Sequence, residues 1–282
     1  MTAAPPFVSV IVPVWQDSAG LAACLDALSL QTWPADRREV LVVDNGGGAS
    51  PGDRPGVRVL REEEQGSYAA RNRGILEARG EVIAFTDAGC VPAPDWLERG
   101  AAHLRSDPAV GMVAGQIRVT LRDPARPTMV EVYESVCSHR QVDYLRRRRF
   151  GATANMLTTR AVLEKVGAFD PRLKSLGDVD WGVRVFEAGF RQVYAEDARV
   201  DHPARRTLSE FRVRSARMTG GFRDLGKTGR WPLSKRIRYA ATGLPPLAGV
   251  IRHPSVLLVG AMVVGVRAVT LVRLLLGGRS GR

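Results

Sequence analysis

A short apolar run that stops at a carboxylate is the feature that most constrains this fold. Residues 82–85 read Val-Ile-Ala-Phe, and Asp87 follows just beyond them with small residues after it. Runs of this kind form strands of sheets that are covered on both faces, and ligands of open α/β sheets bind beyond the carboxyl ends of such strands. Asp87 is therefore a candidate for binding a ribose, a diphosphate or the metal ion of that diphosphate. The alternative is a turn or a helix cap, because residues 92–97 are typical of a helix start.

An earlier apolar run ends in the same way, and together the runs predict a whole sheet. Residues 40–43 are followed by Asp44 and Asn45, and a glycine triplet then begins a loop that lacks the G-x-G-x-x-G dinucleotide fingerprint. Apolar residues at helical spacing follow the apolar runs at residues 8–13 and 57–60. The second of these expected helices brings Arg71 towards the strand ends. We expect strands at residues 8–13, 40–43, 57–60 and 82–85, with helices at 21–28 and 66–76. This alternation indicates an α/β fold.

The positive charge is concentrated in the C-terminal third of the 282 residues. The net charge is +12, and residues 203–252 alone hold twelve lysines and arginines against two acids, while residues 253–282 add four arginines and no acid. A membrane surface is favoured over nucleic acid as the anionic partner, because the basic stretch continues into the most apolar segment. Three widely spaced cysteines predict no disulfide framework, and the N-terminal residues show no signal-peptide pattern. One α/β domain with an appendage is the expected organisation.

Five blocks of this sequence resemble the inverting nucleotide-sugar glycosyltransferases of family 2. The blocks are VSVIVPVWQ, VLVVDN, GSYAARNRGILEARGEVIAFTDAGCVPAPDWL, GATANMLTTRAVLEKVGAFDP and LGDVDWGVRVFEAGFRQVY. The resemblance covers roughly residues 7–225 and implies a GT-A fold, in which a Rossmann-like mixed sheet is flanked by helices. It divides a domain at residues 1–225 into a donor half, about 7–100, and an acceptor half, about 101–225. Residues 226–282 then form a basic and apolar helical extension.

The resemblance also implies which residues bind the donor and a metal ion. The implied donor-binding residues are Pro13, Val14, Trp15, Asp44, Asn45, Arg71, Asp87 and Ala88. Among these, Asp44 is expected to hydrogen-bond the base, and Asp87 belongs to the Asp-x-Asp motif for metal and ribose. Gly89 stands where the family usually has the second Asp of that motif, which should weaken binding of Mg²⁺ or Mn²⁺. Asp87, His202, diphosphate oxygens and water would then complete the shell, although a lone histidine is more often structural.

A second acid site lies at residues 177–184. Asp178 and Asp180 are two residues apart, so on the expected helix they point away from one another. The resemblance makes Asp178 the catalytic base that deprotonates the acceptor hydroxyl, with Gly177 where the family usually has another acid. The alternative is a helix cap at Asp178. Asp180 is expected to pair with Arg184 at i,i+4 spacing.

The rest of the chain gives further expectations for the acceptor side. We expect a strand at residues 110–119, a helix at 129–144, a strand at 155–157 and helices at 160–166 and 208–225. The four consecutive arginines at residues 146–149 predict either a solvated loop or contact with an anionic acceptor or lipid phosphate. Residues 255–272 are apolar except for Arg267 and are long enough, at about 27 Å, for a thin bilayer. Insertion is marginally favoured, and the positive-inside rule then places the protein on the cytoplasmic face of the cell membrane.

These observations favour a membrane-associated glycosyltransferase. It would move a sugar from a UDP- or GDP-linked donor to a glycan or lipid-linked acceptor, such as a cell envelope polysaccharide, with inversion. No nucleic acid partner is expected. Two alternatives remain open at this point. One is a nucleotidyltransferase, which lacks support because residues 12–20 hold no basic glycine loop. The other is a degenerate relative that binds without turnover, favoured by Gly89 and Gly177.

Overall fold

The computed structural model describes residues 4–48, 51–241 and 265. The strands in this part of the chain are β1 (Val8–Val14), β2 (Arg38–Asp44), β3 (Val57–Arg61), β4 (Val82–Thr86), β5 (Val91–Pro92), β6 (Val110–Thr120), β7 (Asn155–Thr159) and β8 (Arg191–Pro203). The helices are α1 (Ser18–Ser29), α2 (Ser67–Glu77), α3 (Trp96–Arg105), α4 (Met129–Cys137), α5 (Gln141–Asp143), α6 (Arg160–Val166), α7 (Gly177–Glu187), α8 (Leu208–Lys227) and α9 (Leu233–Ala241). A 3₁₀ turn, η1 (Ala35–Arg37), and a π-helical turn, η2 (Tyr144–Arg148), complete the elements.

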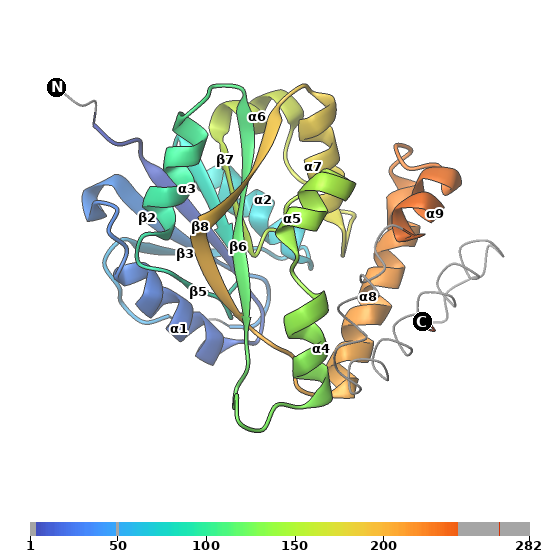
Figure 1. The fold of residues 1–282 in the computed structure, drawn as a ribbon. Helices are drawn as coiled ribbons and strands as arrows, with labels where there is room; N and C mark the ends of the chain where they lie inside the picture. The colour runs from blue at the N-terminus through green and yellow to red at the C-terminus, as the bar shows by residue number, and fades with distance from the viewer. Residues whose placement is uncertain (1–3, 49–50, 242–264, 266–282) are drawn as a thin grey trace. The chain divides into compact units, whose positions relative to one another are not determined.

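The strands form one eight-stranded mixed sheet in the order β3-β2-β1-β4-β7-β6-β8-β5 (Figure 1). The first four strands of the chain pair in parallel, whereas β7 runs antiparallel to both β4 and β6. The predicted α/β class and mixed sheet are therefore confirmed. The strands and helices expected before residue 100 are all present, within a few residues of their predicted ends.

Strand β1 shows why both faces of this sheet are buried. Its alternate residues Val8, Val10, Val12 and Val14 belong to one core cluster that also includes apolar residues of α1 and α3. Ile11 faces the other way, and a Cβ atom added to Gly74 of α2 would lie only 2.5 Å from its side chain. Helices therefore cover both faces of β1, which explains the unbroken apolar runs that mark the strands in the sequence.

The described residues fall into two compact units. The first comprises residues up to 118, 140–171 and 177–202, and it holds most of the sheet together with both acid sites. The second comprises residues 119–139, 172–176 and those from 203 onward. Within the second unit, Glu134 is fully buried and pairs with Arg205 at 3.0 Å and with Arg214 at 3.4 Å, which links α4 to the start of α8. The domain boundary expected at residue 225 falls inside α8, and it stays a prediction.

The single helix expected at residues 129–144 is wrong. Helix α4 ends at Cys137, Ser138 is extended, and His139 has a positive φ of 54°, so the chain turns before α5 begins. The extended backbone of Ser138 ends the helix, because a residue with a ψ of 160° cannot continue the i to i−4 bonding pattern. The arginines at 146–149 also differ from the expected loop, since the first three belong to the π-helical turn η2.

The apolar segment at residues 255–272 lies outside the described residues, apart from residue 265. Among the helices that the structure describes, none combines the length and apolar character needed to cross a bilayer. Helix α8 confirms the basic helix predicted at residues 208–225, and a capping box joins Thr207 and Glu210 at its start.

Candidate functional site

The carboxyl ends of three neighbouring strands bring the predicted donor residues to one edge of the sheet. Val14 of β1 pairs with Asp44 of β2, and Ile11 of β1 pairs with Phe85 of β4. Because these strands are parallel, Asp44 and Asp87 lie at the same edge, as predicted. We call this edge, with Asp44 and Asp87, the acid edge.

Asp87 forms an ion pair with a buried arginine at the acid edge. Arg71 Nη2 lies 2.5 Å from Asp87 Oδ1, and the Arg71 side chain is only 4% exposed while that of Asp87 is 39% exposed. Arg71 also donates through Nη1 to the carbonyl oxygen of Ser67, one turn earlier on α2. The helix-cap alternative for Asp87 is wrong, because α3 begins at Trp96 with Asp95 in the N-cap position. The Asp87 carboxylate is therefore fixed by a buried cation and is still exposed enough to contact a ligand.

Asp44 and Asn45 shape the loop that follows β2. The Asp44 carboxylate accepts hydrogen bonds from the backbone N–H groups of Gly47 and Gly48, at 2.9 and 3.1 Å. The Asn45 side chain donates to the carbonyl oxygens of Glu62 and Glu64 and accepts from the N–H of Gly66. Asn45 is buried and its amide is occupied by backbone partners, so it holds the start of α2 against the edge. A direct contact of either residue with a donor stays a prediction.

The other expected donor residues lie around this edge with very different exposure. Val14 and Ala88 are buried, Pro13 is half-buried, and the Trp15 ring is 61% exposed. An indole exposed beside the end of a parallel strand is available for stacking on a ring of a ligand. Gly47, in the loop after β2, lies close to the backbone that follows β1, since a Cβ atom on Gly47 would be 2.4 Å from the backbone nitrogen of Gln16.

A tyrosine connects the acid edge to the second acid site. The Tyr68 hydroxyl donates to Asp178 Oδ1 at 3.0 Å, and the Arg71 guanidinium lies over the Tyr68 ring, 5.4 Å from its centroid. Gly177 makes room for this ring, because a Cβ atom there would lie 2.7 Å from two of its carbons. The tyrosine thus occupies the space beside residue 177, where the family usually has an acid. Asp87, Arg71, Tyr68 and Asp178 form a continuous chain of contacts, which we call the acid relay.

Asp178 has the environment of a carboxylate that takes up protons readily. Burial raises its pKa above the ordinary range, and the hydrogen bond from Tyr68, the nearby Arg71 charge and the Val179 N–H oppose this rise. The Val179 N–H is 2.9 Å from Asp178 Oδ1, the same oxygen that Tyr68 contacts. Asp178 lies in the first turn of α7 rather than at its N-cap, since the helix begins at Gly177. Leu176, the residue before α7, has a φ of 64°, which is rare for a bulky residue.

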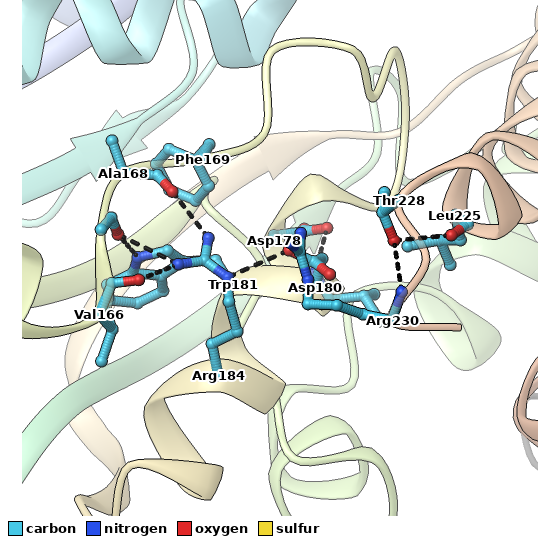
Figure 2. A network of polar contacts seen from close by, with 12 residues as sticks. Val166, Ala168, Phe169, Asp178, Asp180, Trp181, Arg184, Leu225, Thr228 and Arg230 are labelled. Carbon is cyan, nitrogen blue, oxygen red and sulfur yellow. Dashed lines mark hydrogen bonds and ion pairs between the residues drawn. The ribbon is translucent and has the colours of Figure 1, made fainter. Parts of the chain in front are cut away.

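Asp180 has a structural role, as the spacing predicted. It is 1% exposed and pairs with Arg184 at 3.1 Å. Figure 2 shows how Arg184 also donates to the carbonyl oxygens of Val166 and Ala168, the latter at 2.7 Å. This network joins α7 to the end of α6.

A candidate metal-ligand cluster lies beside the acid relay. One ligand atom each from Asp87, Cys90 and His202 lies within 4.8 Å of the other two. The structure thus brings together the two residues predicted to hold a metal, Asp87 and His202, and adds Cys90. Burial, followed by the negative charge of Asp87, raises the pKa of the Cys90 thiol well above its usual value. Hard divalent cations prefer oxygen ligands, so the Cys90 sulfur is the least suitable of the three ligand atoms for Mg²⁺ or Mn²⁺.

Sequence reasoning missed Tyr68 and Cys90 as members of this site. Tyr68 and Arg71 are three residues apart on one helix, and this spacing places them on the same face. Cys90 is three residues after Asp87, and its N–H donates to the Asp87 carbonyl oxygen at 2.9 Å, which closes a turn. Local spacing therefore carried a signal for both residues, although nothing local pointed to the partner of Tyr68.

Comparisons with known proteins agree with this architecture. A family model described as Glycosyl transferase family 2 matches residues 9–167. Glycosyltransferase AglE of Haloferax volcanii is 38% identical over 216 residues, which cover 73% of this chain and 69% of that protein. The chain belongs to glycosyl transferase family 2. Pre-mycofactocin glycosyltransferase of Mycobacterium tuberculosis is 30% identical over 226 residues, and the match spans 45% of that protein.

Solved structures show the same fold. The mannosyltransferase PcManGT from Pyrobaculum calidifontis, in complex with GDP-Man and Mn²⁺, has a TM-score of 0.63 at 20% identity, over 99% of this chain and 77% of that one. Staphylococcus aureus TarS has a TM-score of 0.54 at 18% identity, over 70% of this chain and 36% of that one. The predicted GT-A fold is confirmed. The predicted enzyme class, a glycosyltransferase, is also confirmed by the family and by the relatives' names, against the nucleotidyltransferase alternative.

Proposed function

We propose that this glycosyltransferase moves a sugar from a nucleoside diphosphate donor, UDP- or GDP-linked, to a glycan or lipid-linked acceptor with inversion. The acid relay is the observation that supports this assignment most strongly. It provides one carboxylate beside a buried cation, Asp87, and one carboxylate with a raised pKa, Asp178, within the same unit. The solved mannosyltransferase was captured with GDP-Man, so GDP-mannose is the first donor to test.

In this mechanism Asp178 is the general base. Its Oδ1 atom is occupied by the Tyr68 hydroxyl and the Val179 N–H, which leaves Oδ2 to accept the proton of the acceptor hydroxyl. The acceptor oxygen then forms its bond to the anomeric carbon while the bond from that carbon to the diphosphate breaks. A base is most effective when its pKa is close to the working pH, so burial of Asp178 favours this role. The Arg71 guanidinium lies on the Asp87 side, where the leaving diphosphate gains charge.

A divalent cation, Mg²⁺ or Mn²⁺, belongs to the same proposal. The residues present fit such an ion in part: Asp87 and His202 offer a carboxylate oxygen and an imidazole nitrogen close together. Gly89 offers no ligand, and the soft sulfur of Cys90 is a poor ligand for these hard ions. The bound ion would neutralise the charge that develops on the diphosphate. Treatment with EDTA should abolish transfer, and Mn²⁺ or Mg²⁺ should restore it. Turnover that ignores EDTA would show that side-chain cations suffice.

The substitution Asp178→Asn tests the proposed function directly. It should lower transfer by about 100-fold or more, because a positioned base typically contributes that much. Donor affinity, measured by titration calorimetry with GDP-mannose and the corresponding UDP sugars, should stay within a few-fold, because the base acts only as the new bond forms. Transfer above about a tenth of the wild-type rate would contradict the assignment of Asp178.

The basic C-terminal third supports membrane association at the cytoplasmic face. Residues 203–252 carry ten more positive than negative charges, and an anionic leaflet attracts such stretches. Full-length protein should float with vesicles that contain anionic lipid, and high salt should reduce the recovered fraction, because screening weakens the electrostatic attraction. Equal recovery with neutral and anionic vesicles would contradict the electrostatic part of the proposal.

A further inference from the structure

A basic and aromatic hollow lies at the end of the sheet opposite to His202. Its volume is about 500 Å³, and its lining includes Arg146, Arg149, Phe186, Phe190, Arg191 and Gln192. Arg191 begins strand β8 and His202 lies near its end, so roughly 35 Å of extended chain separates the two. We call it the arginine hollow. Its lining contains none of the four residues of the acid relay, and Phe186 lies about 12 Å further along α7 than Asp178.

Two cations of the arginine hollow have no carboxylate partner among the described residues. Arg191 is neutralised by Asp107, and Arg147, which lies outside the hollow, is 3.9 Å from Asp143. By contrast, neither Arg146 nor Arg149 has an acidic side chain within ion-pair distance in the part of the chain that the structure describes. Two uncompensated guanidinium groups beside one hollow attract an anion, and phosphate fits the guanidinium fork well.

The aromatic side chains give the hollow an apolar wall. The Phe186 ring is 45% exposed, and the Arg149 guanidinium lies over it, 4.6 Å from the ring centroid. Phe190 lines the same hollow and is half-buried. An exposed phenylalanine next to unpaired cations favours a ligand that carries an apolar group as well as a charge.

Gln192 adds a buried acceptor that has no hydrogen-bond donor. Its Nε2 group donates to the carbonyl oxygens of Gly182, at 2.6 Å, and of Arg149, at 3.2 Å, which fixes the orientation of the amide. Its Oε1 atom is buried and lacks a partner in the structure. An atom this buried is closed to a ligand in this conformation, so Gln192 contributes to the hollow by fixing the Arg149 backbone beside it.

The backbone that carries these arginines is also unusual. Residues 144–148 form a π-helical turn, and Arg149 after it is left-handed, with a φ of 58°. Single π-helical turns are often found at functional sites. Gln192 bonds the Arg149 carbonyl, so the strained residue is held by the same side chain that presents the unpaired acceptor.

From these observations we propose that the arginine hollow binds a lipid phosphate, that is, a phosphate group attached to an apolar chain. Arg146 and Arg149 bind the phosphate oxygens, and the Phe186 ring packs against the first apolar groups of the chain. A free phosphate would use the two arginines but not the phenylalanine, and this difference separates the two sources of the anion.

The test uses dihexanoyl phosphatidic acid below its critical micelle concentration as the probe for full-length protein. Titration calorimetry should show saturable binding that Arg149→Gln weakens by about fivefold or more, and Arg146→Gln similarly. Arg147→Gln is the matched control, because it removes the same charge from the same turn outside the hollow, and it should stay within twofold. Phe186→Ala should weaken binding of phosphatidic acid but leave that of inorganic phosphate unchanged. Thermal melting of each variant verifies that it folds.

Each outcome decides the proposal. The lipid assignment would be overturned in favour of a soluble phosphate if inorganic phosphate and phosphatidic acid bound with equal affinity and Phe186→Ala changed neither affinity. Equal weakening by Arg147→Gln and Arg149→Gln would show that only the overall charge matters, and it would overturn the site. Absence of saturable binding would overturn it as well. None of these variants touches the acid relay, so transfer from a soluble donor to a soluble acceptor should continue, and a failed Asp178 test leaves this one intact.

Discussion

Helix α7 carries two aspartates on opposite sides of its first turn, and their surroundings differ sharply. Asp178 contacts a neutral hydroxyl and a backbone N–H, and it keeps partial access to solvent. Asp180 is 1% exposed and pairs with the cation of Arg184. The helix period places residues two positions apart about 200° from one another, so the two carboxylates enter separate environments.

This difference shows how a single helix can provide one acid for the reaction and another for the stability of the fold. A carboxylate that is paired with a full cation is held in place by that cation, as at Asp180. A partly buried carboxylate that receives hydrogen bonds only from neutral donors has a raised pKa and can exchange its proton, as at Asp178. Three changes test this division, beginning with the largest expected effect.

Asp180→Ala should destabilise the fold while sparing the chemistry. Removing one partner of a buried ion pair leaves the other charge uncompensated, which typically costs about 3–5 kcal/mol. Thermal or urea unfolding should therefore show a clear loss of stability, whereas the transfer rate per folded molecule at low temperature should stay close to that of the wild type. The matched control is Asp95→Ala, which breaks an exposed pair of the same i,i+4 spacing with Arg99.

The control should leave the melting temperature almost unchanged, because exposed pairs contribute little to stability. Loss of transfer in folded Asp180→Ala protein would mean that both aspartates of α7 serve the reaction. Equal melting temperatures for the two variants would instead show that the Arg184 network is not important for stability.

Tyr68→Phe should shift the pH dependence of transfer. The Tyr68 hydroxyl lowers the pKa of Asp178 by donating to its carboxylate, so its removal raises that pKa further. A base must be deprotonated to act, and the acidic limb of kcat/KM should therefore move to higher pH. Tyr144→Phe changes a tyrosine whose ring stacks on Phe150 instead, and it should leave this limb in place. A uniform drop in rate with no pH shift would assign Tyr68 to packing alone.

Asp178→Asn should give a small, pH-dependent gain in stability. The folded-state pKa of Asp178 is raised, so the folded protein binds this proton more tightly than the unfolded chain does. Wild-type stability is therefore lost as the pH rises from the ordinary carboxyl value, about 3.9, through the raised value. The melting temperature of the variant relative to wild type should be higher at pH 7 than at pH 4. A constant difference at both pH values would mean that the Asp178 pKa is not raised on folding.

Much of the fold and part of the site follow from local sequence pattern. The apolar runs at residues 40–43 and 82–85 predicted buried strands, and the acids after them predicted the acid edge, because parallel strands end at a common edge. The Asp180–Arg184 pair followed from helical spacing alone. The helix predicted at residues 129–144 was wrong because apolar periodicity does not reveal a backbone break such as the one at Ser138 and His139.

What the sequence determined by itself is the set of features fixed by neighbours along the chain: strands, helices, the charge of the C-terminal third, and the direction in which Asp178 and Asp180 point. What only the tertiary structure decided is the set of partners brought together by strand order. Tyr68 meets Asp178 across 110 residues, and Arg146 and Arg149 share a hollow with Phe186 of another helix. Such contacts depend on how β7 returns antiparallel beside β4 and how α7 then packs, and no short-range periodicity encodes that path.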